Sequence, residues 1–391
     1  MTRVGIIGGG QLGRMLALAA PPLGIYCMTL DPAERSPAAQ VGPALVGAYD
    51  DQERLTELAG SADVLTYEFE NVPVESARFA QGLRPVFPPP EALEVAQDRL
   101  AEKRLFSEIG LEVAAYAAVD SAASLTEALE QIGTPAVLKT RRLGYDGKGQ
   151  VVLDTSAHTA EGWRAIGEVP AIAEALVPFD RELSIVAVRG RDGSSAAYPM
   201  VENHHRDGIL RLTRAPAPSL TPELQAAAER HAGAVMERLG YVGVLAIELF
   251  QVGDRLLGNE MAPRVHNSGH WTDVGAETSQ FENHLRAVTG LPLGSTDALG
   301  VSAMVNLIGS VPPVRAIAAI QGAHLHDYGK EARPGRKVGH ITVRADDVDT
   351  LERRLGQVLA VLDRPATPRR PTRERPISSS PGRESNPRPA G

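Results

Sequence analysis

Two glutamates lie in neighbouring apolar segments, where an unpaired carboxylate would be costly. Glu248 is in "AIELF" and Glu260 is in "LGNEMAPR", and the Gly-Asp pair between them predicts a hairpin turn. On adjacent strands the two carboxylates would repel each other unless a cation lay between them. Mg²⁺ prefers oxygen ligands and commonly shares one or two carboxylates with substrate phosphates. The pair therefore predicts a metal site, whereas either glutamate alone is explained as well by a salt bridge or by solvent exposure.

A glycine-rich segment, "LGYDGKGQ" at residues 143–150, follows the strand-like "PAVLK", which ends in Lys139. The backbone N–H groups of such a loop can surround phosphate oxygens, and Lys148 adds a positive charge. A lysine at a strand end beside this loop is well placed for a polyphosphate. Each signal has a simpler explanation, because most glycine-rich hairpins are only turns and many strand-end lysines are only solvated.

Two further segments are rich in hydrogen-bond donors. "APRVHNSGHW", residues 262–271, contains Arg264, whose guanidinium suits a carboxylate or bicarbonate, and two histidines able to carry a proton, bind a metal or serve the structure. "RPGRKVGH", residues 333–340, places three cations around a turn. That charge is sufficient for one phosphate group, and it is equally compatible with a solvated loop.

The N-terminus matches a dinucleotide-binding motif. Gly8, Gly10 and Gly13 follow an apolar run, and Asp31 ends a second apolar run about twenty residues later. A nicotinamide-dependent oxidoreductase is therefore one interpretation, and it rests on this motif alone.

Composition restricts the class of protein. A chain of 391 residues with 43% hydrophobic and 23% charged residues is long enough for two or three domains. The net charge of −8 argues against a nucleic-acid partner. The single cysteine, Cys27, excludes an intrachain disulfide and a cysteine-rich zinc site. We expect a cytoplasmic protein without a membrane partner, because Gln11, Arg14 and a Pro-Pro pair interrupt the apolar N-terminal stretch.

The order of elements predicts several units. Short apolar runs alternate with helical patterns over the first ninety or so residues, which predicts a parallel sheet, and Asp50 or Asp51 is expected to cap a helix there. Three consecutive prolines end this unit. Residues 91–110 are then expected to form one helical stretch that ends at Gly110. A second unit of strands and hairpins begins near Ala114, and a last unit covers about 301–363.

Taken together, these features resemble the ATP-grasp superfamily. The strings "GGGQLGRM", "GYDGKGQ", "ENHHRDGI", "NEMAPRVHNSGHWT" and "RPGRKVGH" resemble, within it, the 5-(carboxyamino)imidazole ribonucleotide synthases of purine biosynthesis. The resemblance covers residues 3 to about 363. It implies a mixed α/β and α+β fold, with a Rossmann-like N-terminal domain at 1–97, an ATP-grasp domain at 98–300 and a small C-terminal domain at 301–363. Residues 364–391, rich in proline, arginine and serine, are expected to be a disordered tail.

The resemblance also implies an activity, the carboxylation of 5-aminoimidazole ribonucleotide by bicarbonate and ATP through carboxyphosphate, with Mg²⁺ and without NAD. It implies that ATP is bound by Arg99, Lys139, Gly144, Tyr145, Asp146, Gly147, Lys148, Gly149, Gln150, Glu174, Ala175, Leu176, Val177, Glu182, His205, Asn259 and Glu260. It implies that the ribonucleotide is bound by Gln11, Leu12, Tyr145, Asp146, Lys148, Arg336 and Lys337. It assigns bicarbonate to Arg264, His266 and Asn267, with His266 as a proton carrier, and Mg²⁺ to Glu248 and Glu260. A homodimer is expected.

One position departs from the wider superfamily. Many members carry an asparagine metal ligand two residues after the second glutamate, where this chain has Ala262. Three alternatives stay open: another ATP-grasp carboxylase or formate-using ligase, an NAD-dependent oxidoreductase, and a nucleotide-binding protein without catalysis. The string "HNSGHWT" favours the carboxylation of the ribonucleotide over the first alternative.

Overall fold

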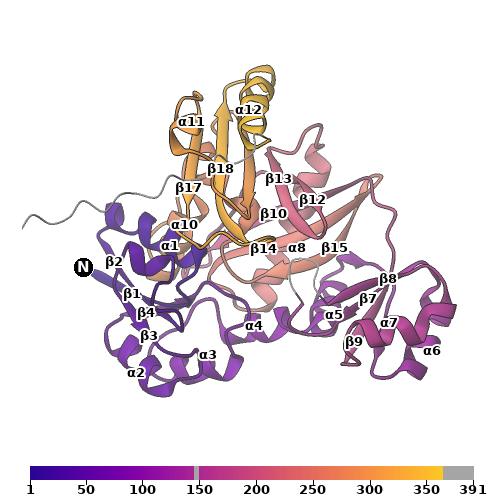
Figure 1. The fold of residues 1–391 in the computed structure, drawn as a ribbon. Coiled ribbons are helices and arrows are strands. Elements are labelled where there is room, and N and C mark those ends of the chain that lie inside the picture. Colours follow the sequence, from indigo (N-terminus) through magenta and orange to yellow (C-terminus); the bar gives the residue numbers. More distant parts are fainter. Residues whose placement is uncertain (145–148, 364–391) are drawn as a thin grey trace, which may run out of the picture.

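The computed structural model describes residues 1–144 and 149–363. Figure 1 shows three regions: the N-terminal unit, a small sheet with its helices on the opposite side, and a large sheet between and above them. Among the described residues, no helix has the length and apolar character needed to cross a bilayer. The predicted tail at 364–391 lies outside the described residues.

The N-terminal unit is a four-stranded parallel sheet in the order β3-β2-β1-β4, as the alternating pattern predicted. Asp51 caps α2, since its side chain accepts hydrogen bonds from the backbone N–H groups of Glu53 and Arg54. The elements are β1 (Thr2–Ile7), α1 (Gln11–Ala19), β2 (Ile25–Asp31), β3 (Ala44–Val46), α2 (Gln52–Gly60), β4 (Val64–Tyr67) and α3 (Val74–Gln81).

The expectation of one continuous helix over 91–110 is wrong. Two helices form, α4 (Pro90–Ala96) and α5 (Arg99–Glu108), and the chain breaks between them at Asp98. The Asp98 carboxylate accepts hydrogen bonds from the Leu100 N–H at 3.1 Å and from Arg141 at 2.7 Å. A cap and a charged partner together outweigh the helical propensity of this stretch.

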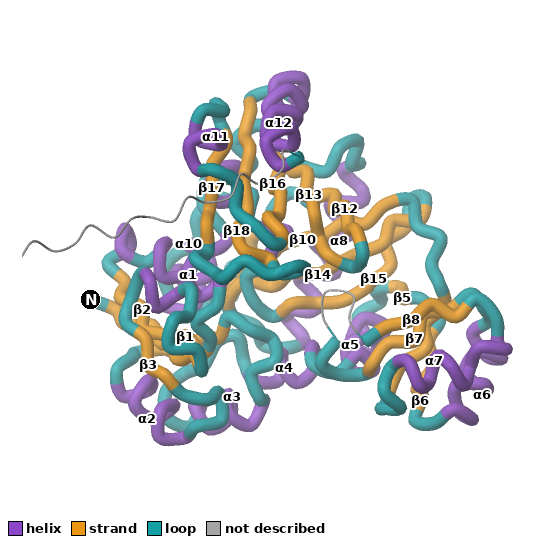
Figure 2. The backbone as a smooth tube through the Cα atoms, viewed as in Figure 1, coloured by secondary structure: helices purple, strands orange, loops and turns teal. Residues whose placement is uncertain are grey.

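The small sheet is antiparallel, in the order β6-β9-β7-β8, and the glycine-rich loop joins β7 to β8 as predicted. Figure 2 shows α6 and α7 packed beside it. Its elements are β6 (Tyr116–Val119), α6 (Ala122–Ile132), β7 (Ala136–Thr140), β8 (Gln150–Leu153), α7 (Thr159–Ala165) and β9 (Ala171–Ala175).

The large sheet has ten strands and carries the chain across the predicted boundary at residue 300. Its three C-terminal strands continue the same sheet through the pairing of β16 with β13. The strands are β5 (Glu112–Val113), β10 (Arg181–Arg189), β11 (Ser195–Ala197), β12 (Val201–Arg206), β13 (Ile209–Ala215), β14 (Gly243–Val252), β15 (Arg255–Ala262), β16 (Val301–Ile308), β17 (Ala323–Asp327) and β18 (Lys337–Ala345). The helices are α8 (Pro222–Arg238), α9 (Thr272–Gly275), α10 (Gln280–Thr289), α11 (Val314–Ala318) and α12 (Val348–Leu362).

Candidate active site

The two glutamates of the predicted metal site lie directly opposite each other on β14 and β15. Directly opposed residues of an antiparallel pair share one face, so both carboxylates are on the same side of the sheet. The register shifts immediately after this pair, which leaves Asn259 as an extra residue in β15. Such bulges redirect side chains beside functional sites.

The electrostatics of this pair fit a divalent cation. Burial and the nearby Glu260 carboxylate both raise the pKa of Glu248. Glu260 is 42% exposed at its side chain and its Oε2 lies 3.3 Å from Nη1 of Arg99. Two close carboxylates with one partly exposed offer the oxygen ligands that Mg²⁺ prefers, although Ala262 offers no third side-chain ligand.

Lys139 lies at the end of β7 and faces Glu174 of β9, with 3.2 Å between Nζ and Oε1. Glu174 is 3% exposed, and its second oxygen lies 3.2 Å from Nζ of Lys103 on α5. Burial lowers the pKa of Lys139, and the Glu174 carboxylate opposes that effect. Glu174 is therefore a buried charge partner of two lysines.

The C-terminal end of the glycine-rich loop is fixed to β7. The Thr140 N–H donates to the carbonyl oxygen of Gly149 at 2.7 Å, and Gln150 pairs with Lys139 across the hairpin. Gly144 lies at the other end of the loop. Tyr145, Asp146, Gly147 and Lys148 lie outside the described residues.

The segment Glu174–Val177, which the resemblance assigns to ATP, covers the end of β9 and the two residues after it. The Ala175 N–H donates to Ala115, and the Leu176 N–H donates to Pro135 at 3.0 Å, so neither N–H is open to a ligand. The Val177 carbonyl accepts from the Phe179 N–H at 3.0 Å.

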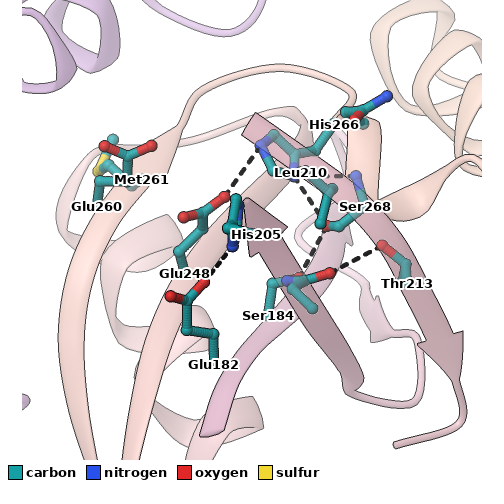
Figure 3. A network of polar contacts seen from close by, with 12 residues as sticks. Glu182, Ser184, His205, Leu210, Thr213, Glu248, Glu260, Met261, His266 and Ser268 are labelled. Carbon is teal, nitrogen blue, oxygen red and sulfur yellow. Dashed lines mark hydrogen bonds and ion pairs between the residues drawn. The ribbon is translucent and has the colours of Figure 1, made fainter. Parts of the chain in front are cut away.

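Glu182 on β10 and His205 on β12 are in contact through Oε2 and Nδ1 (Figure 3). Burial lowers the pKa of His205, but the hydrogen bond with Glu182 and the charge of Glu248 outweigh burial and raise it. Two residues that the resemblance assigns to ATP thus form one unit on the face that carries Glu248.

His266 ends a chain of buried hydrogen bonds across the sheet, shown in Figure 3. The bonds join Thr213 to Asn203 (2.9 Å), Asn203 to Ser184 (2.9 Å), Ser184 to Ser268 (2.8 Å) and Ser268 to Nδ1 of His266 (2.8 Å).

The Ser268 backbone N–H also donates to Nδ1 of His266 at 3.3 Å. Because an N–H can only donate, Nδ1 is the acceptor nitrogen and the proton of the neutral ring is on Nε2. That nitrogen lies 3.6 Å from Oε1 of Glu248. Burial and the Arg264 charge hold the pKa of His266 well below its usual range. His266 is thus a neutral donor toward the site, and its expected role in proton transfer stays a prediction.

Arg264 and Asn267 each have a partner from a distant segment. Arg264 is in contact with the Glu70 carboxylate through Nε and donates to the Val265 carbonyl at 3.0 Å. The Asn267 amide donates to the Asn306 side-chain oxygen at 3.0 Å. The Arg264 charge helps to hold the pKa of Glu70 below its usual range despite burial.

The glycine turn at the N-terminus already holds an anion from the chain itself. The Glu68 carboxylate accepts hydrogen bonds from the Gly10 N–H at 2.8 Å and the Gly13 N–H at 2.9 Å. Asp31 accepts from the Gly9 N–H at 2.8 Å. A Cβ on Gly13 would lie 2.8 Å from the Gly8 carbonyl oxygen, so the close approach needs glycine there. The site where a dinucleotide phosphate would bind is filled by Glu68.

The predicted ribonucleotide residues are distributed around this turn and β18. The Gln11 side chain is in contact with the Lys330 ammonium group, whereas Leu12 is buried and belongs to the core. Lys337 begins β18, and its positive charge contributes to lowering the pKa of Glu70 and of His266. Arg336, next to it, is exposed.

Sequence reasoning missed the partners of the predicted residues. They are Glu68, Glu70, Lys103, Lys330 and Asn306. The first two had a usable signal, since "YEFEN" places acids after a parallel strand that neighbours the glycine turn. Lys103 lies one helical turn after Arg99, which indicates the same face of α5.

Family models match most of the chain. They are the ribonucleotide synthetase preATP-grasp domain at residues 1–97, the ATP-grasp domain at 104–281 and the phosphoribosylaminoimidazole carboxylase C-terminal domain at 302–354.

Individual relatives match nearly end to end. An N5-carboxyaminoimidazole ribonucleotide synthase from Pseudomonas aeruginosa is 53% identical over 361 residues, covering 92% of this chain and 99% of the relative. The crystal structure of the synthetase from Thermus thermophilus is 55% identical with a TM-score of 0.89, covering 92% and 99% of the two chains. The Aspergillus clavatus synthase in complex with ADP and 5-aminoimidazole ribonucleotide is 31% identical with a TM-score of 0.86, covering 93% and 98%.

Proposed function

This chain belongs to the N5-carboxyaminoimidazole ribonucleotide synthase family of ATP-grasp ligases and carboxylates 5-aminoimidazole ribonucleotide at the expense of ATP, and we propose how its residues divide that work. ATP lies between the small sheet and the β14–β15 hairpin. Arg99 and Lys139 neutralise the phosphates of ATP, and residues 144–150 cover these phosphates. The nucleoside part of ATP lies beside Glu174–Val177, Glu182, His205 and Asn259.

Glu248 and Glu260 are the residues that would hold Mg²⁺, and the metal would offset the negative charge of the ATP phosphates. The geometric support is the direct pairing of these two glutamates on one face of the sheet. The ribonucleotide lies across the N-terminal turn, with Gln11 and the backbone of Leu12 at the sugar. Arg336 and Lys337 lie at its phosphate, and Tyr145, Asp146 and Lys148 of the loop complete this site.

Bicarbonate binds beside Glu248. A bicarbonate oxygen attacks the γ-phosphorus of ATP, the bond to ADP breaks, and carboxyphosphate forms. The carbon–oxygen bond of carboxyphosphate that leads to the phosphate then breaks, which gives carbon dioxide and phosphate. The ribonucleotide amine bonds to the carbon of carbon dioxide, and the amine proton leaves to phosphate. Arg264, held by Glu70, and Asn267, held by Asn306, orient the anion. His266 donates from Nε2 to a developing negative oxygen rather than removing a proton.

One observation carries this assignment: Glu248 joins two parts of the site. It is paired with Glu260 on one side and lies 3.6 Å from Nε2 of His266 on the other. A nucleotide metal at the two glutamates would therefore be next to the groups assigned to bicarbonate.

The test is ADP release with each substrate omitted in turn, together with transfer of labelled bicarbonate carbon into the product. ADP release that requires both bicarbonate and the ribonucleotide, with one labelled carbon per ADP, is the expected result. ADP release without the ribonucleotide and without labelled product would contradict the proposal.

The proposal also includes the division into domains, the location in the cell and the oligomeric state. The domain division after residues 97, 300 and 363 is supported by the family-model limits at 97 and 302. We further propose that the protein is cytoplasmic and forms a homodimer, and sedimentation of the purified chain tests the homodimer.

A further inference from the structure

Lys103 is a fully buried lysine on α5, a helix that packs against β15 and β5. Its Nζ donates to the carbonyl oxygens of Gly258 at 3.2 Å and Asn259 at 2.7 Å, and lies 3.2 Å from Oε2 of Glu174. An ammonium group has three donors, and these three acceptors account for all of them. Such complete pairing offsets part of the cost of burying a lysine side chain.

These contacts connect two different sheets. Gly258 and Asn259 belong to β15 of the large sheet, immediately before Glu260, whereas Glu174 belongs to β9 of the small sheet. Figure 2 shows α5 beside both β5 and the β7–β8 pair. Lys103 is therefore a direct tie between the strand that carries a proposed metal ligand and the strand beside Lys139.

Glu102, the residue before Lys103, provides a further contact between α5 and β15. The Glu102 carboxylate accepts a hydrogen bond from the Met261 N–H at 2.6 Å. A Cβ on Gly258 would come within 2.8 Å of the Phe106 side chain and 2.9 Å of the Leu111 side chain, so a larger residue there would require these side chains to move. The backbone of residues 258–261 is thus held on both sides of Glu260.

The positive charge of Lys103 also affects its charged neighbours. Glu174 lies between Lys103 and Lys139, so these three groups comprise two cations and one carboxylate, and the charge of Arg99 also acts on them. Lys103 is 1% exposed at its side chain and Lys139 is 12% exposed. Lys103 forms an ion pair with one carboxylate oxygen of Glu174. Glu174 therefore neutralises the positive charge of Lys139 only in part, and that charge stays available to an anion. Without Lys103, Glu174 and Lys139 would form a neutral pair.

We propose that Lys103 is a positioning residue of the ATP site, which fixes β15 relative to Glu174 and leaves Lys139 with charge to bind phosphate. The proposal rests on the assignment of Lys139 and Glu260 to ATP and its metal. Lys103 touches no substrate in this role and acts through Glu174, Asn259 and Lys139.

The test compares Lys103→Met with Arg104→Met, a matched change at the exposed neighbouring residue of α5. ADP release is measured against MgATP at saturating ribonucleotide and then against ribonucleotide at saturating MgATP. Lys103→Met should raise KM for ATP at least tenfold and leave KM for the ribonucleotide within twofold, and Arg104→Met should change neither. Equal changes in both KM values, or a folded variant with the wild-type KM for ATP, would overturn the proposal.

Two additional variants make each outcome decisive. Lys103→Gln keeps a polar amide at this position without the charge, so it serves if the methionine variant does not fold, and it should show the same selective rise in KM for ATP. Failure of both variants to fold at any temperature would assign Lys103 to the core alone and overturn the proposal. Lys139→Met tests the ATP site separately from the role of Lys103. A large rise in KM for ATP in Lys139→Met with no rise in the Lys103 variants would reject the role of Lys103. No change in KM for ATP in any of these variants would reject the ATP site itself.

Discussion

The Glu68 carboxylate accepts a hydrogen bond from the backbone N–H of Gly13 at 2.9 Å, at the first turn of α1. The same carboxylate accepts from Gly10, so the chain supplies its own anion to the glycine turn. Burial raises the pKa of Glu68, and these two hydrogen bonds oppose that effect. A dinucleotide phosphate would have to displace a buried carboxylate that is already paired.

We expect Glu68→Gln to destabilise the fold by about 1–3 kcal/mol, because the amide nitrogen would face an N–H donor that it cannot accept from. The wild-type chain should bind MgATP and give no heat with NAD in titration calorimetry. Glu75→Gln, at an exposed residue of α3, is the control and should leave the melting temperature unchanged. Binding of NAD by the wild-type chain, or a wild-type melting temperature for Glu68→Gln, would count against this account.

Glu260→Gln should lower turnover by about a hundredfold or more and leave the fold intact, because lost metal positioning removes several kcal/mol of transition-state stabilisation. The side chain is partly exposed, so the isosteric change leaves the core untouched. Turnover is measured across a range of Mg²⁺ concentrations, with the exposed Glu237→Gln on α8 as control. A folded Glu260→Gln variant with near wild-type turnover at low Mg²⁺ would show that Glu260 is not a ligand.

Lys337→Ala should raise KM for the ribonucleotide far more than KM for ATP, because this cation begins β18 in the turn assigned to the ribonucleotide phosphate. Removing a single charge-assisted hydrogen bond to phosphate costs about 1.5–3 kcal/mol, or roughly 10- to 150-fold in KM. Arg333→Ala is the matched control, since Arg333 is exposed in the same turn and paired with Glu331. Comparable changes in both KM values would place Lys337 at ATP or in a structural contact.

How far the sequence predicts this site depends on the distance between partners along the chain. Glu248 and Glu260 could be paired from the sequence because a short hairpin joins them, and strand register then puts them face to face. The parallel N-terminal sheet and the β7–β8 hairpin were equally local inferences, and the structure confirms both.

The missed contacts are long-range. Glu70 and Arg264 are 194 residues apart, and Gln11 and Lys330 are 319 residues apart, so no local pattern links them. The break at Asp98 was missed for the same reason, because its partner Arg141 lies 43 residues further along the chain. The fold and the family follow from the sequence, whereas the side-chain partners that orient the site follow only from the tertiary arrangement.

His284, a buried residue of α10, links the N-terminal sheet to the large sheet. Its Nδ1 accepts a hydrogen bond from the Val244 N–H at 3.1 Å, and its Nε2 lies 2.8 Å from the Thr66 hydroxyl on β4. The Val244 N–H can only donate, so Nδ1 carries no proton and Nε2–H donates to Thr66. Protonation of Nδ1 would break the contact with Val244, and burial lowers the pKa of His284 to about 4.

Between pH 6.5 and about 4, the unfolded chain therefore holds a proton on this histidine that the folded chain does not. The free energy of unfolding should fall as the pH falls through this range, by up to about 1.4 kcal/mol per pH unit from this group. The free energy of unfolding is measured with urea at pH 6.5 and at pH 5. Between these pH values, the wild-type chain should lose more of it than His284→Gln, whose glutamine cannot titrate. His158→Gln, at an exposed histidine, should keep the wild-type loss. If His284→Gln lost as much stability as the wild-type chain between these pH values, the buried neutral ring would not be a source of acid sensitivity.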